Sequence, residues 1–147
     1  MDLINLIDKK LKSDEIIDLF ENYDVDVIYR YDRLYEGSED EYVASIEELS
    51  LEFLFDEQQL LRAIFIHAKD KGGFTDKELG DYAIQFFADV SVAQEYAEDN
   101  EIKYRNGNTK FLGENRAWIL FEFKGYSIHY EYRDAVFSLV TLQRVQA

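Results

Sequence analysis

The chain contains no cysteine and no proline, and only seven of its 147 residues are glycine. Without cysteine it can form neither a disulfide nor a thiolate metal centre, which fits a reducing compartment. The absence of proline and the scattered glycines leave no segment with the composition of a linker. No stretch approaches the ~18 consecutive apolar residues of a membrane-spanning helix. We therefore expect a single domain over residues 1–147 that does not associate with a membrane.

Enough apolar material is present for one core, because hydrophobic residues make up 47% and aromatic residues 16% of the chain. Disorder requires low hydrophobicity together with high net charge, and only the second condition holds here. The first ten residues are amphipathic and acidic, whereas a secretory signal has a basic start and an unbroken apolar stretch. These features predict a folded, cytoplasmic protein.

Negative charge is the strongest bias, with a formal net charge of -15. Residues 1–48 carry 15 acidic and 5 basic side chains, so two-thirds of the excess lies in the first third of the chain. Such a surface repels nucleic acids and anionic membranes and attracts basic protein surfaces. The composition therefore predicts a basic protein as partner, and neither a nucleic acid nor a membrane.

Two regions have the periodicity of helices. Apolar residues recur at helical spacing over 2–22, and Ser13 precedes two acidic residues that favour a first helical turn. This region predicts one broken helix or two short ones. Residues 91–94 fit a capping box that opens a helix near 91–100, and residues 75–78 fit another for a short helix.

Alternation of apolar and polar residues predicts strands over 25–31 and 42–46, a hairpin over 49–68 and a three-stranded meander over 117–142. Residues 81–87 are a further candidate strand, and Asn106-Gly107-Asn108 is typical of a loop. The expected fold class is α+β, with an antiparallel sheet and the helices packed on one face. The expected core includes Phe53, Phe55, Ile64, Ile119, Phe121 and Ile128.

Motifs of catalysis are absent from the sequence: there is no phosphate-binding glycine loop, no Gly-x-Ser-x-Gly elbow and no zincin helix. His129 and Glu131 would project from one face of a strand, but the pattern supplies no third metal ligand. The acidic runs lack the spacing of an EF-hand. We therefore expect no enzymatic activity, no metal and no cofactor.

The most informative segment interleaves tyrosines with carboxylates between Tyr23 and Tyr42. Tyrosine offers a large contact area with a polar tip and is enriched at protein interfaces, and neighbouring carboxylates can pair with a partner's Lys or Arg. Alternatively, the alternating residues of 25–31 face the core of a half-buried strand and the acids face water. The predicted partner-binding residues are Tyr31, Asp32, Tyr35, Glu36, Glu39, Asp40, Glu41 and Tyr42.

Three stretches, about half the chain together, carry a resemblance. They are the strand–acidic turn–strand of Leu49–Ile66, the capped helix Ser91–Asn100, and the meander Trp118–Leu142 with its Leu-Val-Thr-Leu end. This arrangement resembles the immunity proteins of bacterial polymorphic toxin systems, a class with many unrelated folds. The resemblance implies a cytoplasmic inhibitor that binds a cognate toxin domain and occludes it. The alternatives are a nucleic-acid-mimicking inhibitor of a DNA-binding protein and a small enzyme or ligand-binding domain.

Overall fold

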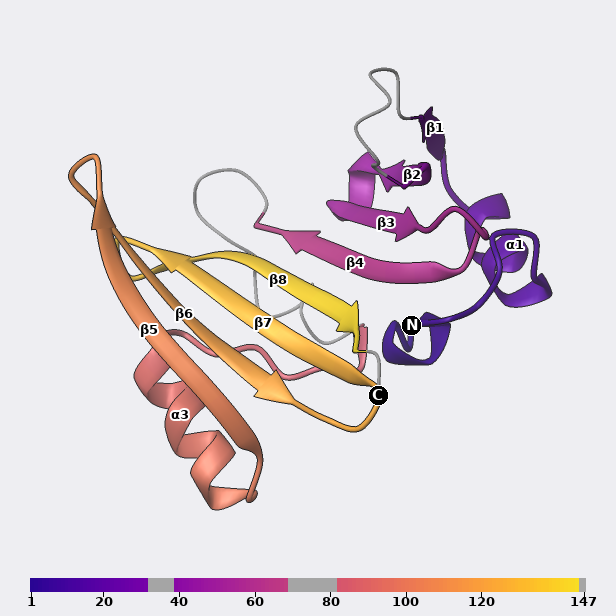
Figure 1. Ribbon diagram of the computed structural model, residues 1–147. Helices are drawn as coiled ribbons and strands as arrows, with labels where there is room; N and C mark the ends of the chain where they lie inside the picture. Colours follow the sequence, from indigo (N-terminus) through magenta and orange to yellow (C-terminus); the bar gives the residue numbers. More distant parts are fainter. Residues whose placement is uncertain (32–38, 69–81, 146–147) are drawn as a thin grey trace.

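A computed structural model describes residues 1–31, 39–68 and 82–145 (Figure 1). The described strands form one 8-stranded antiparallel sheet in the order β1-β2-β3-β4-β8-β7-β6-β5. An N-terminal helix and a second helix pack against this sheet, so the expected α+β class is confirmed. No helix in the described part of the chain is long and apolar enough to cross a membrane.

The first half of the chain contributes short helical elements and four strands. They are η1 (Ile4–Leu6), α1 (Asp14–Glu21), β1 (Asp26–Arg30), β2 (Glu41–Ile46), η2 (Glu47–Leu49), β3 (Leu51–Phe55) and β4 (Leu61–His67). Residues 2–22 therefore contain two short helical elements, η1 and α1, rather than one broken helix, which was the other form that the sequence predicted. The hairpin expected over 49–68 is confirmed, and its turn is built around Asp56. The Oδ1 of Asp56 accepts hydrogen bonds from the backbone N–H groups of Gln58 and Leu60, at 2.9 and 3.0 Å.

The second half contributes one described helix and four strands. They are α3 (Val90–Asp99), β5 (Lys103–Phe111), β6 (Glu114–Glu122), β7 (Tyr126–Arg133) and β8 (Val136–Arg144). The expected meander is confirmed and gains β5 as a fourth strand. The helix begins earlier than Ser91, because Asp89 is the residue that caps it and accepts a 3.0 Å hydrogen bond from Val92 N–H. The short helix expected over 75–78 lies outside the described residues.

Residues 106–108 are part of strand β5, so the expectation of a loop there was wrong. Gly107 pairs across the sheet with Trp118 of β6. A Cβ on Gly107 would lie 2.9 Å from the Nε1 of Trp118, so the indole occupies the space that any other side chain would need. This glycine marks a close approach between strands rather than a turn.

The strand expected over 81–87 is also absent where the structure describes it, from residue 82 onward. The carbonyl groups of this segment bond to side chains of the sheet beneath it. Tyr130 and Tyr132 donate hydrogen bonds of 2.8 Å to the carbonyl oxygens of Gln85 and Phe87, respectively. The segment is thereby fixed across the face of β7 instead of joining the sheet as a strand.

The core lies on one face of the sheet. The register places Phe53, Ile64, Leu142, Ile128 and Phe121 in one row across five neighbouring strands. The ring of Phe20 in α1 packs 5.4 Å from that of Phe53, and the ring of Tyr96 in α3 lies 6.5 Å from that of Phe121. Both helices therefore cover the same face, as expected. None of the six expected core residues is more than 5% exposed.

Candidate functional site

Strand β1 is exposed on both of its faces. Its edge position places it beyond β2, whereas α1 covers β3 through the contact of Phe20 with Phe53. Four large side chains of this region are therefore about half exposed: Val27 at 51%, Ile28 at 54%, Tyr29 at 48% and Tyr31 at 53%. The expectation that this strand is half-buried was wrong, because alternation cannot reveal whether a helix covers the strand.

Three tyrosines gather at the end of β1 and the start of β2, and we call them the tyrosine patch: Tyr29, Tyr31 and Tyr42. Tyr29 and Tyr42 are direct cross-strand partners, with ring centroids 4.9 Å apart. The ring of Tyr31 stacks on that of Tyr29 at 5.9 Å. The contacts of Tyr29 with both other rings restrict the rotation of the three side chains, so the patch loses little conformational entropy when a partner binds.

The carboxylates beside the patch have different roles. Asp40 accepts a hydrogen bond from the Tyr29 hydroxyl and is therefore in direct contact with the tyrosine patch. Glu41 lies 3.1 Å from Arg62 and 3.7 Å from Arg30 and is largely neutralised by them. Glu39 has a half-exposed side chain 3.5 Å from Arg62. Glu39 and Asp40 are therefore better placed than Glu41 to attract a basic partner.

The structure thus brings together five of the predicted partner-binding residues: Tyr31, Glu39, Asp40, Glu41 and Tyr42. The other three, Asp32, Tyr35 and Glu36, lie outside the described residues. Tyr29 belongs to the same surface, although the sequence analysis omitted it from the predicted site. The alternation of this segment left open whether Tyr29 faces the core or a partner, and only the edge position of β1 decides between the two.

The bond between Tyr29 and Asp40 has a measurable consequence. Donation from the phenol to the Oδ2 of Asp40, at 2.5 Å, raises the pKa of Tyr29 to about 12. The raised pKa means that the folded protein favours the protonated phenol. This stabilisation is complete below the ordinary pKa of about 10 and is lost as the pH rises toward 12.

We expect Asp40→Asn to lower the pKa of Tyr29 toward 10, because an amide accepts the hydrogen bond without opposing phenolate formation. Ultraviolet difference titration against the matching Tyr29→Phe protein isolates this phenol from the other tyrosines. Glu98→Gln is the control, since Glu98 accepts an equivalent bond from Tyr104 at 2.7 Å on the opposite side of the fold. A Tyr29 pKa near 10 in the unmodified protein would contradict the hydrogen bond.

A second concentration of negative charge adjoins β1. A hollow of about 450 Å³ is lined by Asp24, Asp26, Glu47, Glu48 and Ser45. Asp26 and Ser45 are cross-strand partners on the face of the sheet opposite the core. Within the described ranges, no group of three or more His, Asp or Glu side chains is arranged to hold a metal ion. The hollow therefore adds to the negative potential around the edge strand.

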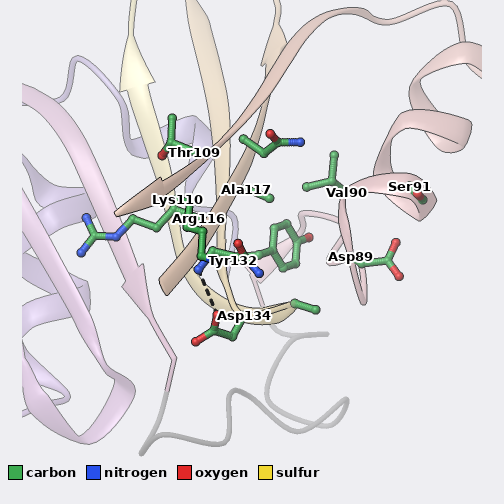
Figure 2. A pocket seen from close by; sticks show the side chains of 12 residues that line it. Asp89, Val90, Ser91, Thr109, Lys110, Arg116, Ala117, Tyr132 and Asp134 are labelled. Atoms are coloured by element: carbon green, nitrogen blue, oxygen red, sulfur yellow. Dashed lines mark hydrogen bonds between the residues drawn. The ribbon is translucent and has the colours of Figure 1, made fainter. Parts of the chain in front are cut away.

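A hollow beside α3 is lined by side chains that fix loops (Figure 2). It measures about 620 Å³ and lies between the start of α3 and the ends of β5, β6 and β7. Asp89 caps the helix, the Tyr132 hydroxyl bonds to the backbone, and Asp134 accepts a 3.0 Å hydrogen bond from Asn115 N–H. These three side chains anchor the helix start, the segment before it and the β7–β8 turn.

Both histidines lie on the sheet face opposite the core, each beside a carboxylate. His129 is 3.6 Å from Glu131 and its ring centroid is 5.5 Å from that of Trp118. The imidazole of His129 lowers the pKa of the Glu131 carboxyl. The Nε2 of His67 lies 2.7 Å from the Oε1 of Glu52. His129 and Glu131 therefore lie on the same face of β7, as their spacing on a strand predicts.

No family model, no curated protein and no solved structure matches this chain.

Proposed function

We propose that this chain is a cytoplasmic binding protein that neutralises a bacterial toxin domain by occlusion. In this proposal the tyrosine patch, with Glu39 and Asp40, docks on a basic surface of the toxin and covers its active site or substrate groove. One observation carries the proposal: Tyr29 and Tyr31 stack on each other and remain about half exposed, next to the partly buried Tyr42 and beside carboxylates at the edge of the sheet. In a folded chain with a well-filled core, such residues are available to a partner.

The two kinds of side chain would make different contributions. Tyrosine rings bury a large area and act as anchors, which mainly determine how slowly a complex dissociates. Exposed carboxylates increase the rate of encounter with a basic protein, and the net charge of -15 adds a long-range attraction. A toxin that acts on nucleic acid would itself offer a basic groove of the required charge.

A charge-reversal experiment tests the steering part of the proposal. Glu39→Lys with Asp40→Lys is expected to reduce the association rate by about tenfold or more at low salt and to flatten its salt dependence. Glu95→Lys with Asp99→Lys on exposed positions of α3 changes the net charge equally and is the control. Stopped-flow measurement of association, with the basic protein that the unmodified chain retains from lysate of its parent organism, provides the rates.

The anchoring part is tested by Tyr31→Ala, which removes an exposed ring and should leave the fold intact. The dissociation rate should rise by an amount equivalent to about 2 kcal/mol if Tyr31 is a hot spot. If the acid reversals and their α3 control slow association equally, and Tyr31→Ala leaves dissociation unchanged, the tyrosine patch is a solvated surface. The proposed docking site would then be refuted.

A further inference from the structure

The two edges of the sheet are protected to very different degrees. Sheet edges expose unpaired backbone groups, and proteins usually prevent their association with charged side chains, proline or bulges. Strand β5, at one edge, carries Lys103, Arg105 and Lys110. Strand β1, at the other edge, carries Val27-Ile28-Tyr29 at its centre and pairs with β2 without a bulge. No strand in the described part of the chain pairs with the outer side of β1.

The sequence of β1, Asp-Val-Ile-Tyr-Arg, is complementary to itself in the antiparallel direction. If two copies align about Ile28, Asp26 of each lies opposite Arg30 of the other. Val27 of each then lies opposite Tyr29 of the other, and the two Ile28 side chains meet. Opposite charges and β-branched–aromatic pairs are both favourable cross-strand neighbours. Every position of the strand therefore gains a suitable partner from a second copy.

The surroundings of Asp26 favour the same arrangement. This residue lines the acidic hollow together with Asp24, Glu47 and Glu48. The Arg30 side chain is 60% exposed, and its ion pair with Glu41 spans 3.7 Å. In a dimer, the Arg30 guanidinium of the second copy would lie beside Asp26 and place a positive charge next to the acidic hollow. This local attraction opposes the general repulsion between two chains of net charge -15.

We propose that two copies of this chain associate through their β1 edges, antiparallel and with a two-fold axis at Ile28. The interface is isologous, and the two sheets become one continuous sheet through backbone hydrogen bonds. The contact uses the edge of β1 and leaves the faces of the sheet open. The tyrosine patches of both copies then lie on the same face, on either side of the axis.

The complementarity of Asp26 and Arg30 permits a charge-swap experiment. Sedimentation velocity of the unmodified protein at physiological salt should show a monomer–dimer equilibrium over about a hundredfold range of concentration. Asp26→Arg and Arg30→Asp, made singly, each place like charges opposite one another and should weaken the dimer at least tenfold. The double variant restores opposite charges at both positions and should recover dimerisation. Arg105→Asp on the β5 edge is the matched control and should leave the equilibrium unchanged.

Hydrogen exchange provides a second measurement on the unmodified protein. The outward-facing amides of β1 should become protected as the concentration rises, while those of β5 should not. Circular dichroism of each variant verifies that the fold is retained. A protein that is monomeric at every concentration overturns the proposal. A dimer that the single variants do not weaken, or that the double variant does not restore, places the interface elsewhere and also overturns it.

Discussion

Replacing Phe53 by alanine is expected to lower the free energy of unfolding by about 3–5 kcal/mol. Phe53 is fully buried and begins the row of core residues that runs across β3, β4, β8, β7 and β6. Its ring contacts Phe20 of α1, so the substitution removes apolar contacts with the helix and leaves a cavity between helix and sheet. Urea unfolding followed by circular dichroism measures the loss.

The same substitution at Phe111 is the control, because this ring is 55% exposed at the end of β5. Its removal should lower the free energy of unfolding by no more than about 1 kcal/mol. Equal losses at the two positions would show that the core does not lie on the face that contains Phe53.

Replacing Arg144 by methionine is expected to destabilise the protein by a similar amount, about 3–5 kcal/mol. Arg144 Nη2 lies 3.2 Å from the Oδ2 of Asp56, whose side chain is only 7% exposed. Arg144 is itself shielded, with 17% of its side chain exposed. Methionine preserves much of the side-chain volume but leaves the buried carboxylate of Asp56 without a counter-charge, which is the source of the loss.

Asp8→Asn separates this buried interaction from a surface one. Arg144 also donates a 3.0 Å hydrogen bond to Asp8, whose side chain is 55% exposed. Loss of an exposed ion pair should lower stability by about 1 kcal/mol at most. Thermal and urea unfolding of both variants provide the comparison. If Arg144→Met is no more harmful than Asp8→Asn, the carboxylate of Asp56 is hydrated in solution and the buried pair is not important for stability.

The core was predictable from the sequence because strand alternation is a local property. Phe53 and Phe121 were assigned to the buried face from alternation alone, and both are at most 1% exposed. Alternation failed to predict the exposure of β1, because a strand is half-buried only where a helix covers it and α1 does not extend to this edge of the sheet. It also failed at Gly107, where a glycine that resembles a loop residue instead accommodates the indole of Trp118.

The candidate site was predictable in composition but not in the roles of its members. The interleaved tyrosines and acids identified the correct region for an exposed aromatic surface. However, Glu41 is paired with Arg62, a residue of β4 that is distant in sequence, and only the register of the sheet reveals this pairing. The self-complementarity of Asp26 and Arg30 is visible in the sequence, but it matters only once β1 is known to be an edge strand.

The pairing between β4 and β8 has a consequence for the speed of folding. Every other strand pairing in the described sheet joins strands that are consecutive in the numbering, whereas this one joins residues 63–67 to residues 139–143. Consecutive strands need only short chain closures, so the ribbons β1–β4 and β5–β8 can each form from local contacts. Their union requires closure of a long loop, whose entropic penalty must be met before the contacts between β4 and β8 are gained. We expect the closure between β4 and β8, rather than the formation of any hairpin, to limit the rate at which this protein folds.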